Sequence, residues 1–114
     1  MGLRVLLVDD QASMRMLLGL HLELEGHQVV GEAGDAKDAV TQAGLLAPEV
    51  VVLDQELPHG PGTRILPELR ALVPGVRVIV FSADPSVRLT AAGAGADGFL
   101  LKGEPLQELT ALLK

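Results

Sequence analysis

The chain has 114 residues, the length of a single domain, and its net charge of −6 at pH 7 argues against direct binding of nucleic acid. It has no cysteine, which excludes disulfides, thiol redox chemistry and thiolate metal sites, and its only aromatic residues are Phe81 and Phe99, too few for base-stacking platforms. No apolar run approaches the roughly 20 residues of a membrane-spanning helix, so we expect a cytoplasmic protein without a membrane partner.

Two strand patterns and one helical pattern fill the first part of the chain. Arg4–Val8 is a short apolar run without polar alternation, which is typical of a strand buried on both faces. Gln11–Glu25 has the apolar spacing of a helix, and Gly26 is placed to end it. The apolar stripe of this helix consists of Met14, Leu17, Leu18 and Leu22. His27–Ala33 then predicts a second, weaker strand.

The middle of the chain repeats this alternation. Asp35 is placed to cap a helix over Ala36–Leu46, and Val50–Leu53 has the pattern of another buried strand. Thr63–Val73 predicts a helix in which Pro67 falls in the first turn, where a missing N–H costs least. The apolar positions of that helix are Ile65, Leu66, Leu69 and Leu72.

The last part of the chain supplies two more strands and two helices. Val76–Phe81 and Gly98–Leu101 predict the strands, Pro85–Gly93 is a short and weak helical pattern, and Pro105 opens the last helix. The apolar positions of the last helix are Leu106, Leu109 and Leu113. Strand and helix thus alternate five times, which predicts one α/β domain over residues 1–114, with a doubly wound parallel sheet and helices on both faces.

The residues that follow the strands carry the chemistry, because ligands of a doubly wound sheet bind beyond the carboxyl ends of its strands. Asp9 and Asp10 follow the first strand, Asp54 the third, Ser82 the fourth and Lys102 the fifth. Three carboxylates that lie together repel one another and stay ionised only beside a cation, and their oxygens favour a hard ion such as Mg²⁺. A carboxylate beside Mg²⁺ can attack a phosphoryl group, whose oxygens a hydroxyl and an ammonium can then neutralise.

Four motifs, in this order along the chain, resemble the receiver domain of bacterial two-component response regulators. They are Val8-Asp9-Asp10, Leu53-Asp54-Gln55-Glu56-Leu57-Pro58 with Gly62, Phe81-Ser82-Ala83, and Gly95–Lys102. The resemblance covers essentially the whole chain and implies a flavodoxin-like fold with strand order 2-1-3-4-5. The segments 29–35 and 95–102 lean towards the subfamily whose output is a helix-turn-helix DNA-binding domain.

The resemblance also implies a role for each residue at the ends of the strands. Asp54 resembles the phosphoacceptor, and Lys102 resembles the lysine that accompanies it. Asp10 resembles the direct Mg²⁺ ligand, Asp9 binds the ion directly or through water, Asp54 is a further ligand, and Glu56 offers its backbone carbonyl. The chain is then expected to be a signalling domain and not an enzyme, although it catalyses its own aspartyl phosphorylation and dephosphorylation.

Ser82 and Phe99 resemble the hydroxyl and aromatic residues of the family's conformational switch. The segment between Ser82 and Lys102 is shorter than is usual in the family, and Gly103 follows Lys102 where proline or an acidic residue is more common. Phe99 also lacks the hydroxyl of tyrosine. Pro85–Gly93 is also short and has a glycine near its end, so we expect it to form the least ordered helix, which phosphorylation orders or shifts.

The partners implied by the resemblance are a sensor histidine kinase or phosphotransfer protein, an output domain or downstream protein, and a second copy of the chain in a homodimer. The expected output is transcriptional. In receivers the kinase docks near the first helix, where we expect an exposed Met/Leu patch ringed by polar groups. Its residues are Gln11, Met14, Arg15 and Leu18.

Other interpretations of the same residues stay open at this point. The segment Asp54-Gln55-Glu56 suggests an aspartate-nucleophile phosphatase, although that family carries its motif on the first strand and has a cap domain. A receiver-like interaction module that no longer takes phosphate is a second alternative, and the complete acidic set with Lys102 argues against it. Asp9 and Asp10 are also suited to capping a helix, and Ser82 to a turn.

Overall fold

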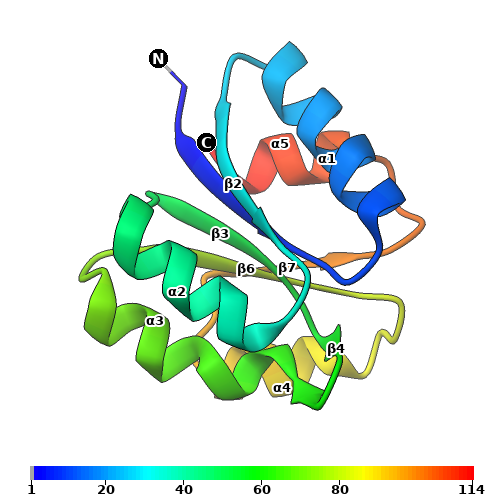
Figure 1. Cartoon of the computed structure of the whole chain (residues 1–114). Coiled ribbons are helices and arrows are strands. Elements are labelled where there is room, and N and C mark those ends of the chain that lie inside the picture. Colours follow the sequence, from blue (N-terminus) through cyan, green and yellow to red (C-terminus); the bar gives the residue numbers. More distant parts are fainter. Residues whose placement is uncertain (1) are drawn as a thin grey trace.

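The computed structural model describes residues 2–114 and shows a five-stranded parallel sheet with helices on both faces (Figure 1). The strands are β1 (Arg4–Val8), β2 (Gln28–Ala33), β3 (Val50–Asp54), β6 (Arg77–Ser82) and β7 (Gly98–Leu101). Their order is β2-β1-β3-β6-β7, which is the expected order 2-1-3-4-5 when the strands of this sheet are counted alone. The predicted doubly wound, flavodoxin-like fold is therefore confirmed.

Two helical layers cover the sheet. The helices are α1 (Ala12–Leu24), α2 (Ala36–Leu46), α3 (Leu66–Leu72), α4 (Val87–Gly93) and α5 (Gln107–Leu112). Helices α1 and α5 lie on one face of the sheet, and α2, α3 and α4 lie on the other (Figure 1). Leu7 and Val52 belong to the core under the first layer, whereas Leu6 and Val51 belong to the core under the second. This burial on both faces explains why the strands are continuous apolar runs.

Helix α1 buries a narrower face than its sequence predicts. Leu18 and Leu22 are 1% and 0% exposed, but Leu17 is 51% exposed, so its place in the predicted stripe is wrong. Successive helical residues are rotated by about 100°, which turns Leu17 away from the sheet when Leu18 faces it. The burial of Leu18 also contradicts its expected place in an exposed docking patch. The other large apolar side chains that are exposed are Met16, Leu20 and Leu24 on α1, Leu45 on α2, Leu72 on α3 and Leu89 on α4.

The helix boundaries confirm one prediction and correct another. Asp35 caps α2 as expected, because its carboxylate accepts a hydrogen bond of 2.8 Å from the backbone N–H of Asp38. The helix predicted over Thr63–Val73 instead begins with a 3₁₀ turn at Gly62–Ile65, and α3 follows it. Pro67 accounts for the break, because it has no N–H to donate and is best accommodated where a new helix starts. Within residues 2–114 no helix is long and apolar enough to cross a membrane.

A short hairpin that the sequence analysis missed folds the chain back after Asp54. Its strands are β4 (Glu56–Leu57) and β5 (Gly60–Pro61), which pair antiparallel. The hairpin brings Gly62 back against the backbone of Asp54 and Gln55. The Gly62 N–H donates a hydrogen bond of 2.8 Å to the Gln55 carbonyl. A Cβ atom at Gly62 would lie 2.1 Å from the Asp54 carbonyl oxygen. The fold therefore requires glycine at this position because of backbone contact.

We expect Gly62→Ala to lower the free energy of unfolding by about 1–3 kcal/mol, the usual cost of forcing extra volume into a packed site. The matched control is Gly44→Ala in α2, where a Cβ meets side-chain atoms no closer than 3.9 Å. Alanine is the better helix former by about 1 kcal/mol, so the control should be neutral or stabilising. Urea unfolding of the two variants measures this difference, and equal effects would contradict the backbone contact at Gly62.

Candidate functional site

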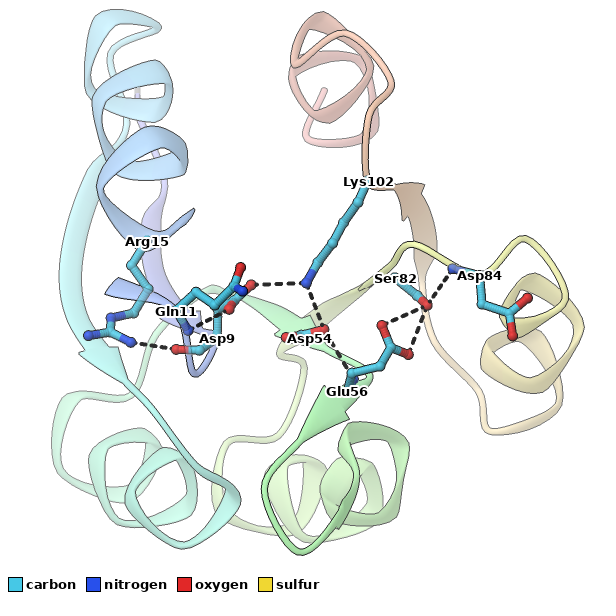
Figure 2. A network of polar contacts seen from close by, with 8 residues as sticks. All are labelled: Asp9, Gln11, Arg15, Asp54, Glu56, Ser82, Asp84 and Lys102. Atoms are coloured by element: carbon cyan, nitrogen blue, oxygen red, sulfur yellow. Dashed lines mark hydrogen bonds and ion pairs between the residues drawn. The ribbon is translucent and has the colours of Figure 1, made fainter. Parts of the chain in front are cut away.

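The predicted site residues meet at the carboxyl edge of the sheet. Asp9 and Asp10 directly follow β1, Asp54 ends β3, Ser82 ends β6 and Lys102 directly follows β7. Asp54 and Ser82 lie on adjacent strands of the sheet, β3 and β6. Figure 2 shows Asp9, Asp54 and Lys102 pointing toward one another, with Ser82 on the far side of Asp54. The parallel topology therefore gathers residues that are far apart in the sequence.

Lys102 joins the two buried carboxylates. Its Nζ lies 3.2 Å from Oδ1 of Asp54 and 3.4 Å from Oδ2 of Asp9, and each of these acidic side chains is only 1% exposed. The backbone N–H of Lys102 donates a hydrogen bond of 2.8 Å to the carbonyl of Ser82, which fixes the start of the lysine side chain. One ammonium thus stands between two negative charges that have almost no contact with water.

Backbone donors hold one oxygen of each buried carboxylate. The Gln11 N–H donates to Oδ1 of Asp9 at 2.9 Å, and the Glu56 N–H donates to Oδ1 of Asp54 at 3.1 Å. The other oxygen of each group, Oδ2, is buried and accepts no hydrogen bond within residues 2–114. Oδ2 of Asp9 still has the Lys102 ammonium at 3.4 Å, whereas Oδ2 of Asp54 has neither an ion pair nor a hydrogen bond in the described part of the chain. A buried carboxylate oxygen without a partner is costly, so Oδ2 of Asp54 indicates that a further partner belongs at the site.

A hard divalent cation fits that requirement. One carboxylate oxygen from each of Asp9, Asp10 and Asp54 lies within 4.8 Å of the other two, and Asp10 is the exposed member of the group. Mg²⁺ prefers oxygen ligands and commonly combines one or two carboxylates with water and phosphate oxygens. The group of three carboxylates expected from the sequence is therefore present, with the oxygen chemistry that Mg²⁺ uses.

The pKa values of Asp54 and Lys102 reflect burial together with the charges that lie beside each group. Burial raises the pKa of the Asp54 carboxyl from 3.8 to about 6, and the neighbouring Asp9 charge raises it as well. The Glu56 N–H and the Lys102 ammonium act in the opposite direction but do not cancel these effects. Burial alone would lower the pKa of Lys102, but the Asp54 and Asp9 carboxylates outweigh it and hold that pKa above its ordinary value.

Arg15 has a role that the sequence analysis did not identify. Its guanidinium donates to the backbone carbonyl of Asp9, and its Nε forms a 2.9 Å ion pair with Glu32 on β2. Arg15 therefore holds the acidic loop against the sheet, instead of lying free in a docking patch. No sequence pattern distinguishes this arginine from other exposed basic residues of a helix, so only the tertiary contact reveals its role.

The two predicted switch residues have partners that the sequence did not specify. The Ser82 hydroxyl donates to the Glu56 carboxylate, 3.0 and 2.9 Å from its two oxygens, and is fully buried. Phe99 is 9% exposed, and the Arg88 guanidinium carbon lies 4.8 Å from the centre of its ring. Glu56 makes this contact through its side chain, whereas the family resemblance implies a role only for its backbone carbonyl.

Comparison of the sequence with known families and curated proteins matches nearly the whole chain. The family described as response regulator receiver domain matches residues 5–114. The chain is 36% identical over 117 residues to the chemotaxis protein CheY of Thermotoga maritima, a match that covers 100% of this chain and 98% of that protein. It is 36% identical over 108 residues to the transcriptional regulatory protein PdtaR of Mycobacterium tuberculosis, covering 93% of this chain and 52% of that protein.

The solved structures agree with these sequence matches. The structure of a LuxR-family two-component response regulator from Aurantimonas sp. SI85-9A1 has a TM-score of 0.90 at 30% identity, covering 97% of this chain and 81% of that chain. The chain spans about half the length of PdtaR and of other curated transcriptional regulators that it matches. The expected likeness to regulators of transcription is thereby confirmed.

The raised pKa of Asp54 predicts how stability changes with pH in the metal-free protein. The pKa in the folded state, about 6, lies above the ordinary value of 3.8, so folding favours the protonated group and stability falls as pH rises between these values. Asparagine carries no charge at any pH. We expect Asp54→Asn to raise the free energy of unfolding at pH 7 by about 1–3 kcal/mol.

Urea unfolding with a chelator present tests this prediction at neutral and at acidic pH. Below the ordinary pKa of 3.8 both states of Asp54 are protonated, so the advantage of Asp54→Asn should largely disappear there. An asparagine variant that is less stable than the wild-type protein at pH 7 would mean that the ion pair with Lys102 outweighs burial and the Asp9 charge.

Proposed function

Because the chain belongs to the response regulator receiver domain family, we propose that it accepts a phosphoryl group on Asp54 as a reversible signal. The observation that carries this proposal is the buried Asp54 carboxylate, whose Oδ1 is held by Lys102 and the Glu56 N–H while its Oδ2 accepts no hydrogen bond. A carboxylate with a free oxygen and a raised pKa is suited to act as a nucleophile toward phosphorus.

The chemistry follows from the groups around Asp54. A carboxylate oxygen of Asp54 attacks the phosphorus of a phosphohistidine, a phosphorus–oxygen bond forms, and the phosphorus–nitrogen bond breaks with its electron pair leaving on nitrogen. The Lys102 ammonium, 3.2 Å from Oδ1, is placed to neutralise charge on the phosphoryl oxygens. We assign the Ser82 hydroxyl as a further donor to those oxygens.

The metal assignment extends the same proposal. We propose that Asp9, Asp10 and Asp54, with the backbone carbonyl of Glu56, hold Mg²⁺. When bound, the ion supplies positive charge that offsets the three carboxylates and the incoming phosphoryl oxygens. Asp9 already interacts with Lys102 and the Gln11 N–H, whereas Asp10 is exposed, which favours Asp10 as the direct ligand.

The wider role is that of a signalling domain. Receiver domains are signalling domains, and that assignment holds for this chain. We propose a sensor histidine kinase or phosphotransfer protein as donor and a transcriptional output, with residues 1–114 as the receiver unit. We propose that the phosphoryl donor docks on α1, because this helix exposes several apolar side chains. Rates of phosphoryl transfer from a purified kinase to α1 variants would test this docking surface. These side chains are Met16, Leu17, Leu20 and Leu24.

The phosphoacceptor is tested by intact mass after incubation with acetyl phosphate and Mg²⁺. We expect one phosphoryl group on the wild-type protein and none on Asp54→Asn, which keeps the shape of the side chain and removes the nucleophile. Asp38→Asn, the same change on the exposed surface of α2, serves as the control and should be labelled like the wild-type protein. Labelling of Asp54→Asn to the wild-type level would disprove the assignment.

The metal ligands are tested by titration of Mg²⁺ into the unphosphorylated protein. We expect Asp9→Asn to weaken binding by roughly tenfold, and Asp10→Asn to weaken it more, because loss of a direct ligand costs more than loss of an outer contact. Unchanged affinity in Asp10→Asn would exclude it as a ligand. A greater loss in Asp9→Asn would reverse the two roles.

A further inference from the structure

In the unphosphorylated protein the Ser82 hydroxyl already donates a hydrogen bond to the Glu56 carboxylate. The hydroxyl lies 3.0 Å from Oε1 and 2.9 Å from Oε2 of the Glu56 carboxylate, so its single proton is shared between two negatively charged oxygens (Figure 2). The Ser82 oxygen in turn accepts a 3.0 Å hydrogen bond from the Asp84 N–H. Both the donor and an acceptor site of this buried hydroxyl are therefore in use.

Both ends of this contact are fixed by the backbone. Glu56 opens β4, its N–H is bound to Asp54, and the next side chain, Leu57, is 8% exposed and anchors the hairpin in the core. Ser82 ends β6 and accepts the Lys102 N–H through its carbonyl. The Glu56 side chain is thus directed at Ser82 from a rigid base.

Glu56 has no competing ionic partner in the described part of the chain. Lys102 is paired with Asp9 and Asp54, and no ion pair within residues 2–114 includes the Glu56 carboxylate. Its hydrogen bonds to Ser82 are therefore the interactions that orient it. A charge-assisted hydrogen bond of this kind is stronger than one between neutral groups.

We propose that Glu56 is a positioning residue that restrains Ser82 in the unphosphorylated state by occupying the hydroxyl proton that a phosphoryl group on Asp54 would need. This inference rests on the proposed function. A hydroxyl has one proton to donate, so Ser82 cannot serve the Glu56 carboxylate and a phosphoryl oxygen equally. Formation of the phosphorylated state must break the contact with Glu56, which opposes that state.

The contact also leads away from the site toward α4. The Asp84 N–H is bound to the Ser82 oxygen, and the Asp84 carboxylate accepts both the N–H and the hydroxyl of Ser86, at 2.9 and 2.8 Å, just before α4 begins. Movement of the Ser82 hydroxyl therefore changes the contact made by Asp84. Release of Ser82 from Glu56 would therefore affect the start of α4 through the hydrogen bonds of Asp84.

The first experiment measures the contact in the metal-free protein, without phosphorylation. Unfolding equilibria of the wild-type protein, Glu56→Ala, Ser82→Ala and the double variant form a double-mutant cycle. We expect a coupling of about three- to tenfold in the unfolding equilibrium constant, the size of an ordinary net hydrogen bond, because the Glu56 side chain is exposed to water. Additive effects of the two substitutions would overturn the proposal, because they would show that the two side chains do not interact.

The second experiment measures affinity for beryllofluoride, a phosphoryl mimic, with Mg²⁺ present. We expect Glu56→Ala to bind the mimic about three- to tenfold more tightly than the wild-type protein, and to show little gain in the Ser82→Ala background. An equal gain in both backgrounds would overturn the proposal, since Glu56 would then act through its charge alone. Glu56→Gln keeps an acceptor without the charge and should lie between the wild-type protein and Glu56→Ala.

Glu23→Ala, which removes an exposed carboxylate from α1, controls for loss of negative charge and should leave mimic affinity unchanged. Failure of the proposed function is separable from failure of this inference. If the wild-type protein neither binds the mimic nor accepts phosphate, the proposed function is wrong, while the unfolding cycle still decides whether Glu56 holds Ser82.

Discussion

The repulsion between two buried carboxylates is the constraint around which the rest of this structure is arranged. Asp9 and Asp54 lie at adjacent strand ends with almost no exposure to water, and one lysine ammonium, that of Lys102, lies within 3.4 Å of both. One positive charge cannot neutralise two buried negative charges as well as the nearby Asp10. Burial first, and then the charge of Asp9, raise the pKa of Asp54, and the site is therefore suited to gain positive charge.

Such a site persists only if the surrounding backbone is rigid. The antiparallel hairpin after β3 returns Gly62 to the Asp54 carbonyl, at a distance that admits no side chain. On the other side, Arg15 and Glu32 hold the loop that carries Asp9. The apolar core on both faces of the sheet stabilises the fold, and this stabilisation offsets the electrostatic cost of the buried carboxylates. Such an unfavourable arrangement of charges is common at functional sites.

The partners of Ser82 connect this electrostatic site to the rest of the molecule. A phosphoryl group on Asp54 would add negative charge where Lys102 is already shared, and it would compete with Glu56 for the hydroxyl of Ser82. The Ser82 oxygen also accepts a hydrogen bond from the Asp84 N–H, so a change of partner at Ser82 would affect the segment that leads into α4. If the proposed phosphorylation takes place, a change at Asp54 and a change at the start of α4 would therefore both depend on the hydroxyl proton of Ser82.

The sequence by itself determined the fold class, the strand order through its family resemblance, and the gathering of Asp9, Asp54 and Lys102, because parallel strands bring their carboxyl ends to one edge wherever they lie in the chain. Only the tertiary structure decided which side chains meet. The contacts from Arg15 to the Asp9 carbonyl and from Glu56 to Ser82 depend on rotamers and on a hairpin that local patterns do not encode. Apolar spacing likewise did not reveal that α1 exposes Leu17, because burial depends on how the helix is rotated against the sheet.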